Sequence, residues 1–137
     1  MRRDMDETPR YAIAAAVQLP SVSDVEFAAS LTELRELAKT LGFTVVRTFV
    51  QKRNGFDATA YLGVGKRQEI RAFVDDEPAG REETEPSAGR LPGHMNVVLV
   101  DHEISPSQAR NLEKETGGEV MDRTMVILEI FHRNARS

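Results

Sequence analysis

The order of apolar and polar positions predicts strands that alternate with helices along the whole chain. Four apolar runs have the length and the β-branched content of strands: 11–19, 43–50, 96–100 and 119–121. Four segments between and after them repeat apolar residues at helical spacing: 24–41, 66–74, 106–116 and 122–134. Because such units give parallel strands through right-handed crossovers, we expect an α/β domain. Its four-stranded, mainly parallel sheet should be flanked by helices in the order β-α-β-α-β-α-β-α.

The ends of the predicted helices carry recognisable capping signals. Ser23 or Asp24 precedes an apolar stripe and should cap the first helix, and Gly42 should end it. Ser105-Pro106, with glutamine three positions after the serine, is typical of a capping box. The stripe of the first helix consists of Phe27, Leu31, Leu34, Ala38 and Leu41.

Chain length and charge distribution indicate one domain with one irregular segment. We expect a flexible N-terminus over 1–10 and a single domain over 11–137. The acidic, Pro- and Gly-containing stretch 75–94 is predicted to be a mobile loop. Because acids concentrate there, the formal net charge of −4 does not argue against a basic surface elsewhere.

Composition excludes several classes of protein. The 137 residues include no cysteine, so disulfides, thiolate metal sites and cysteine nucleophiles are absent. The apolar run "YAIAAAV" is too short to cross a bilayer, and no convincing signal-peptide cleavage site follows it. We expect a cytoplasmic protein without a membrane span.

The stretch "YLGVGKRQEI" superficially resembles a phosphate-binding loop. A P-loop needs glycine where the chain has Ala60, and serine or threonine where it has Arg67. Two interpretations remain for the segment. It is either a tight turn, with Gly63 and Gly65 in unusual backbone conformations, or a helix start that binds an anion together with Lys66.

Basic residues are densest around this motif and alternate with Phe49, Phe56 and Tyr61, a composition suited to phosphate contact and base stacking. A solvated face is the alternative. The candidate RNA- or phosphate-binding residues are Lys52, Arg53, Gly63, Gly65, Lys66, Arg67 and Arg71.

The run Asp101-His102-Glu103 follows a strand and could bind a metal or transfer protons, but a structural role is favoured. We therefore expect neither a catalytic residue nor a metal site.

Several of these stretches together resemble the N-terminal domain of the HflX family of GTPases. The similarity runs from Ala12 to Ala135 and is most specific from Asp101 to Thr124. "YLGVGK" is similar to the family signature Tyr-Ile-Gly-Ser-Gly-Lys, with valine in place of serine. The stretches are "SLTELRELAKTLGFTVV", "QKR", "AYLGVGKRQEI", "DHEISPSQARNLEKETGGEVMDRT" and "ILEIFHRNA".

The resemblance implies a cytoplasmic ribosome-binding module. Relatives bind the large ribosomal subunit and its rRNA and split ribosomes under stress. GTP and Mg²⁺ bind in a later G domain, reached through a helical linker. The chain ends at Ser137, where the family would continue, and it contains neither a Walker A nor an Asn-Lys-x-Asp motif. No cofactor is therefore expected in this chain. The segment 75–94 looks like an insertion relative to the family.

Two further interpretations remain open. The "GVGK" loop and Asp101 could bind ATP or GTP, or hydrolyse it weakly. The chain could also be a free-standing regulatory or assembly domain that docks on a G domain in cis or in trans. In that case the last helix would leave apolar residues uncovered, and self-association is expected. These apolar residues are Met125, Ile127, Leu128 and Phe131.

Overall fold

Four parallel strands form one sheet in the order β2-β1-β3-β4 in the computed structural model, which describes residues 10–81 and 97–135. All three pairings are parallel, so the predicted four-stranded sheet is confirmed. The strands are β1 (Arg10–Gln18), β2 (Phe43–Lys52), β3 (Val97–Val100) and β4 (Glu119–Asp122).

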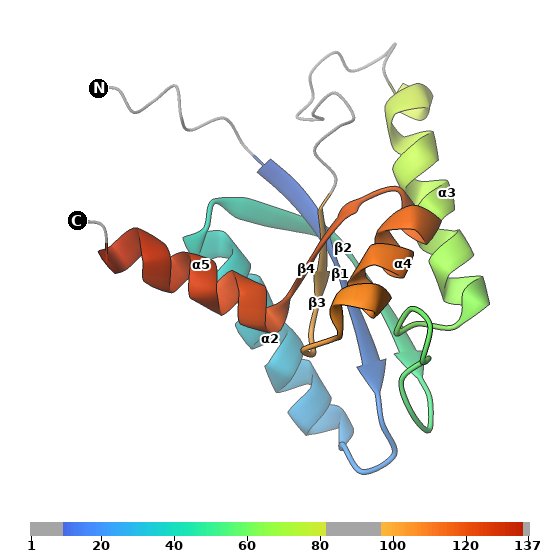
Figure 1. Cartoon of the computed structure of the whole chain (residues 1–137), viewed down its shortest axis with the longest axis horizontal. Helices are drawn as coiled ribbons and strands as arrows, with labels where there is room; N and C mark the ends of the chain where they lie inside the picture. Colours follow the sequence, from blue (N-terminus) through green and yellow to red (C-terminus); the bar gives the residue numbers. More distant parts are fainter. Residues whose placement is uncertain (1–9, 82–96, 136–137) are drawn as a thin grey trace.

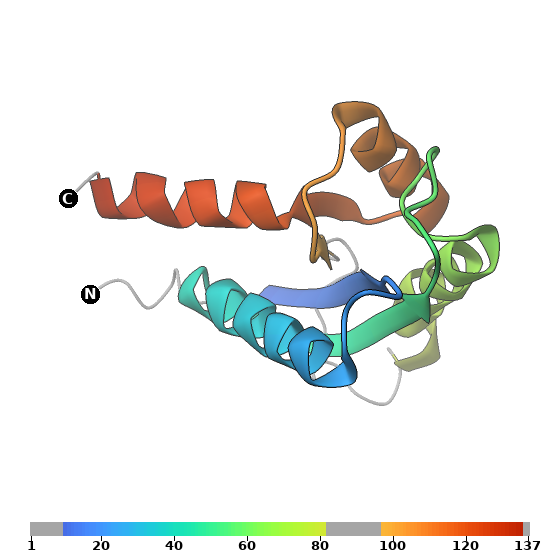
Figure 2. The same cartoon turned by 90° about the horizontal axis from the view of Figure 1, so that it is seen from below.

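Helices cover both faces of the sheet and follow the predicted order. In Figure 1 the helices α2 and α5 lie on one side of the strands, and α3 and α4 lie on the other. Figure 2 shows α5 running away from the end of β4, on the side opposite to α4. The helices are α2 (Asp24–Thr40), α3 (Val64–Arg81), α4 (Pro106–Thr116) and α5 (Arg123–Ala135).

The central strand β1 divides the core into two layers. Ala12 and Ala14 face α2 and α5, whereas Ile13, Ala15 and Val17 face α3 and α4. Strand β1 lies between β2 and β3 and is covered on both faces, so it reads as a continuous apolar run. Alanine side chains on both faces let the helices approach the sheet closely.

The caps explain where the helices begin and end. Ser23 and Ser105 each accept a hydrogen bond from the backbone N–H three residues later. The predicted capping box forms at Ser105, and at Ser23, predicted as a cap, Glu26 completes a second one. Gly42 has φ +91° and Gly117 has φ +84°, the left-handed conformation that glycine adopts without a steric penalty. Asp122 accepts a hydrogen bond from the Met125 N–H at 2.9 Å and so caps α5.

Helix α3 is longer than its sequence pattern predicts. It begins at Val64 and continues to Arg81, whereas the prediction ended the helix at Val74 and began a loop at Asp75. Arg71 Nε donates to Asp75 Oδ2 at 3.2 Å, and this i,i+4 pair stabilises the turn where the helix was expected to end. The rest of the predicted loop, 82–94, and the predicted flexible segment 1–9 lie outside the described residues.

Strand β2 is an edge of the sheet and contains an irregularity. Its register against β1 shifts between the pairs Ala12–Val45 and Ile13–Arg47, so Val46 is an extra residue without a partner. The guanidinium of Arg47 lies over the rings of Phe49 and Phe73, 4.6 and 5.2 Å from their centroids. Among the helices of 10–81 and 97–135, none combines the length and the apolar character needed to cross a membrane.

Candidate functional site

The loop between β2 and α3 is held by its own backbone hydrogen bonds. Asp57 Oδ1 accepts from the N–H groups of Thr59 and Ala60, at 2.8 and 2.9 Å. Asp57 and Tyr61 also exchange two backbone hydrogen bonds, at 3.0 and 2.8 Å. The pKa of Asp57 lies below its ordinary value, mainly because the Ala60 N–H stabilises the carboxylate, with Arg67 and Arg53 acting in the same direction.

The glycines of "YLGVGK" do not have the role that the sequence predicts for them. Tyr61, not Gly63 or Gly65, adopts a positive φ, of 71°. The predicted unusual conformation at the two glycines is therefore wrong. A Cβ at Gly63 would lie 2.8 Å from Arg53 Nη1, so a side chain at this position would displace the end of that guanidinium. No atom lies within 4 Å of a Cβ placed on Gly65.

The side chain of Tyr61 fills the carboxyl edge of the sheet between β1 and β3. Its hydroxyl accepts from the Val17 N–H at 2.9 Å and lies 2.7 Å from His102 Nδ1. Because the hydroxyl accepts from Val17, its own proton can be donated to His102. The ring of Phe56 packs against His102 with centroids 4.6 Å apart. Burial raises the pKa of Tyr61, so the phenol stays protonated.

Asp101 lies on the other side of the same edge and binds a buried cluster of donors. Its Oδ1 lies 2.7 Å from Arg123 Nη2, and its Oδ2 accepts from Ser30 Oγ at 2.7 Å. Arg123 also donates to the Ser30 carbonyl oxygen and pairs with Glu33 Oε1 at 3.0 Å. The cluster joins α2, β3 and α5, so Asp101 acts as a structural residue.

These contacts occupy the topological switch point of the sheet. The chain moves from β1 toward β2 and from β3 toward β4, so ligands of open α/β sheets would bind outside the ends of β1 and β3. Tyr61, His102 and Asp101 fill that position with paired groups. Asp101 and His102 have different partners, and the described residues contain no group of three or more potential metal ligands.

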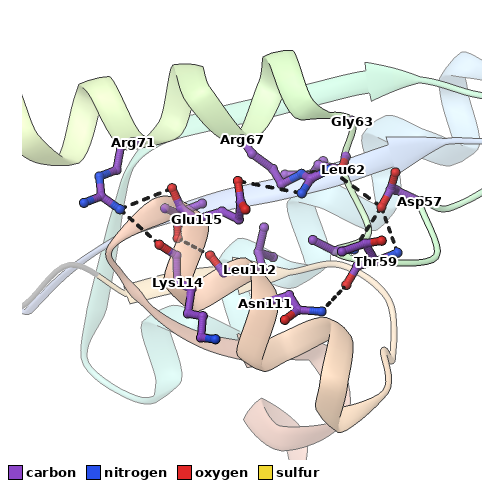
Figure 3. Close-up of polar contacts among 12 residues, drawn as sticks. Asp57, Thr59, Leu62, Gly63, Arg67, Arg71, Asn111, Leu112, Lys114 and Glu115 are labelled. Carbon is purple, nitrogen blue, oxygen red and sulfur yellow. Dashed lines mark hydrogen bonds and ion pairs between the residues drawn. The ribbon is translucent and has the colours of Figure 1, made fainter.

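Two of the predicted phosphate-binding residues are engaged within the domain, and one of them is buried. Arg67 is 5% exposed, and its Nε donates to the Leu62 carbonyl oxygen at 3.0 Å. Its terminal nitrogens lie 3.7 Å from Asp57 and 3.8 Å from Glu115. Figure 3 shows Arg67 and Arg71 pointing from α3 toward α4. Arg67 therefore joins the two helices and the loop.

Arg71 also contacts α4. Its Nη1 donates to the carbonyl oxygens of Lys114 and Glu115, at 3.1 and 3.4 Å, in the last turn of that helix (Figure 3). A cation at a helix C-terminus satisfies free carbonyl groups and the helix dipole. Although Arg71 is exposed, its guanidinium is already used within the domain.

The other predicted basic residues remain accessible at the carboxyl edge. Lys52 is exposed and Arg53 is half-buried, and neither makes an ion pair within the described part of the chain. Arg53 Nε donates to the Gly55 carbonyl oxygen at 2.9 Å, which holds its guanidinium beside Gly63. Lys66 lies in the first turn of α3 and pairs with Glu69 at 3.1 Å.

A cavity of about 470 Å³ opens beside Lys52 and Arg53. It lies where the loops after β1 and β2 come together at the lower end of the sheet in Figure 1. Among its residues from the loop after β1, Ser23 and Asp24 were predicted only as helix caps and none as a ligand contact, although loops at carboxyl ends of strands commonly bind ligands. The lining residues are Gln18, Leu19, Pro20, Val22, Ser23, Asp24, Lys52, Arg53 and Asn54.

Replacing Asp101 should destabilise the fold strongly. Asp101→Ala leaves the partly buried Arg123 without its closest acceptor, and we expect a loss of about 3 kcal/mol in the free energy of unfolding. Urea denaturation measures it. Glu33→Ala is the matched control, because Glu33 pairs with the same guanidinium from an exposed position and should cost under about 1 kcal/mol. Equal losses of unfolding free energy in the two variants would contradict the structural role given to Asp101.

The hydrogen bond between Tyr61 and His102 should make stability depend on pH. Burial lowers the pKa of His102, Asp101 partly offsets this, and Arg123 adds to it. The unfolded chain therefore binds a proton at higher pH than the folded chain does. Neutral His102 therefore contributes fully to stability above pH 6.5, its ordinary pKa. This contribution is lost as the pH falls through the lower pKa that His102 has in the folded state.

The measurement is the free energy of unfolding between pH 7.5 and pH 5 for the wild type and His102→Gln. The glutamine carbonyl can still accept from Tyr61 but does not titrate. We expect the variant to lose less stability than the wild type on acidification. Parallel curves would show that His102 does not carry the pH dependence.

Comparisons with known proteins show which family has this fold and these motifs. A profile of the family described as GTP-binding GTPase N-terminal matches residues 28–132. A GTPase HflX from Gluconacetobacter diazotrophicus is 42% identical over 92% of this chain and 32% of its own length. A GTPase HflX from Caldanaerobacter subterraneus is 34% identical over 89% of the chain and 25% of its own length.

Solved structures have the same fold. The GDP complex of SsGBP superposes with a TM-score of 0.56 at 21% identity, over 93% of this chain and 30% of that one. The GDP complex of a GTP-binding protein from Sulfolobus solfataricus gives a TM-score of 0.53 at 20% identity, over 89% of this chain and 30% of that one. The chain thus spans about a third or less of these proteins, and it belongs to the HflX family of GTPases as its N-terminal domain.

Proposed function

We propose that this domain binds rRNA of the large ribosomal subunit and thereby positions or regulates an HflX-type GTPase during ribosome splitting under stress. The adjacent cations Lys52 and Arg53 are the observation that carries the proposal. They lie at the carboxyl edge of the sheet and form no ion pair among the described residues, although Arg53 is near enough to Asp57 to lower its pKa. Unpaired cations of this kind can replace the counterions of RNA phosphates, which favours binding at low salt.

Lys66 extends this cationic edge toward α3. No acidic residue lies in the first turn of α3, so the positive end of the helix dipole is not neutralised there. Lys66 adds a further positive charge, and its exposed pairing with Glu69 contributes little to stability. Lys52, Arg53 and Lys66 therefore form the proposed phosphate contacts, with Gly63 next to the Arg53 guanidinium and Gly65 leaving the helix start open.

The aromatic residues of the segment are not available for base stacking. Phe49 and Tyr61 are buried, and Phe56 packs against Tyr61 and His102. Their predicted role as stacking platforms is therefore wrong, since they form the core beneath the loop. The proposed interaction depends instead on phosphate contacts, which place a protein on RNA without reading its sequence.

The geometry disfavours the alternative of a nucleotide-hydrolysing loop. Gly63 lies against Arg53, so the backbone there is covered, and Asp101 is bound to Arg123 and Ser30. We assign GTP and Mg²⁺ to the G domain that the longer relatives carry, and a cytoplasmic location to the whole protein. The domain itself is then a binding module without a catalytic residue.

A second candidate function is suggested by the outer face of α5. Val126 is buried against the sheet, whereas Met125, Ile127, Leu128 and Phe131 are between 45% and 67% exposed. By helical spacing the four residues lie on the half of α5 that faces away from Val126. The helix projects from the sheet in Figure 2. An apolar stripe of this kind is typical of an interaction surface. Because the relatives are about three times longer or more, we propose that it contacts the linker or G domain that follows.

Binding to ribosomes should depend on the exposed cations. Lys52→Ala combined with Lys66→Ala should weaken binding to large subunits by about tenfold or more and should flatten its salt dependence, because two phosphate contacts are lost. Co-sedimentation across a salt series measures this. Lys39→Ala with Lys114→Ala is the control, since both lysines are exposed on other helices. No binding at low salt, or equal effects of the two pairs, would contradict the proposal.

The α5 stripe should cause the isolated chain to self-associate at high concentration. Leu128→Glu with Phe131→Glu should restore a monomer, because charged side chains cannot be buried between two copies without a large desolvation cost. Sedimentation velocity gives the oligomeric state. Val25→Glu is the control, because Val25 is 79% exposed on α2, outside the stripe. A wild-type chain that stays monomeric at high concentration would argue against an uncovered docking surface.

A further inference from the structure

We propose that the cavity beside Lys52 and Arg53 holds one unpaired ribonucleotide of the bound RNA. The inference rests on the proposed function, and it adds a specific ligand to a surface otherwise described by its charge. The cavity has a volume of about 470 Å³, within the range of small-molecule sites, roughly 300–1,000 Å³. Cationic, apolar, amide and carboxylate groups line the same cavity, and a nucleotide has a complementary part for each.

The cations provide the phosphate contact. Lys52 and Arg53 line one side of the cavity and make no ion pair in the described part of the chain. The backbone N–H of Arg53 donates to the Gln18 carbonyl oxygen at 3.1 Å, so the end of β2 is fixed to the end of β1. The two charges are thus held at one side of a preformed site.

The opposite wall is also held in place before any ligand binds. Gln18 Nε2 donates to the Val22 carbonyl oxygen and to Asp24 Oδ1, both at 2.9 Å. The Val22 N–H donates to the Leu19 carbonyl oxygen at 3.0 Å and closes the turn. Because the loop after β1 is tied at three points, binding would cost little conformational entropy.

The loop offers an apolar surface and an amide for the base. Leu19, Pro20 and Val22 line the cavity and are not fully buried. A flat base can lie on such side chains, and this contact removes apolar surface from water. Asn54, near the start of the loop after β2, presents an amide that can both donate to and accept from a base edge. A base inside a duplex could not reach these groups, so the site is suited to an unpaired nucleotide.

Asp24 provides a means to distinguish RNA from DNA. Its Oδ1 accepts from Gln18, but no donor among the described residues bonds to its Oδ2. Ser23 Oγ is used to cap α2, so the carboxylate is the free acceptor on that wall. A ribose 2′-hydroxyl can donate to it, whereas deoxyribose cannot. Asp24 also ties the loop through Gln18 and lies in the first turn of α2, so the carboxylate is held in place for this contact.

The test measures binding of the 137-residue chain to short labelled oligonucleotides by fluorescence anisotropy at low salt. The ligands are single-stranded RNA, DNA of the same sequence and an RNA duplex, and unlabelled GMP or AMP serves as competitor. We expect single-stranded RNA to bind at least about tenfold more tightly than DNA, which is the effect of one hydrogen bond to a charged group. Lys52→Ala should lower RNA affinity about tenfold, and Lys39→Ala should leave it unchanged.

Asp24→Asn separates this inference from the proposed function. It should abolish the preference for RNA while DNA affinity stays equal or rises, since a negative charge is removed. Thermal unfolding confirms that the variants fold.

The outcomes separate the two proposals. If RNA and large subunits bind but RNA and DNA have equal affinity, or duplex RNA binds as well as single strands, the cavity assignment is wrong and the proposed function stands. Displacement of RNA by GMP or AMP at equal concentrations would assign the cavity to free nucleotides. Absence of all RNA and subunit binding would overturn both proposals.

Discussion

The hydroxyl of Tyr61 holds the carboxyl edge of the sheet together. It joins the end of β1, through the Val17 N–H, to the residue after β3, through His102. Tyr61 itself sits at the end of a loop whose backbone has a left-handed residue at this position. A buried phenol needs partners for its donor and its acceptor, and this geometry supplies both. The loop, the first turn of α3 and the edge of the sheet therefore take up one fixed arrangement.

That arrangement determines where a ligand can bind. The position outside β1 and β3, where an open α/β sheet would usually hold a nucleotide, is occupied by Tyr61, His102 and Asp101. Accessible charge is displaced to the neighbouring ends of β1 and β2, where Lys52 and Arg53 line a cavity. The fold thus separates a closed, structural half of its edge from an open, cationic half.

The order of the strands and helices could be predicted from sequence because apolar periodicity and capping residues are local signals. Ser105 and Gly42 have the predicted roles for this reason. The functional surface was harder to predict, since composition cannot show which cations have partners. Arg67 and Arg71 look like Lys52 in the sequence, but each also has an acceptor in α4, more than forty positions away. Likewise, the distance between Gly63 and Arg53 depends on how the loop folds back.

The irregular register of β2 affects how the domain behaves among other copies of itself. This strand is a long edge with two exposed valines, Val46 and Val50, and such an edge can pair with a neighbouring chain. The extra residue Val46 bends the strand, and the cation Arg47 lies over two aromatic rings beside it. A second β2 strand would meet a twisted edge and a like charge. The bulge and Arg47 thus disfavour edge-to-edge pairing between two copies of the domain.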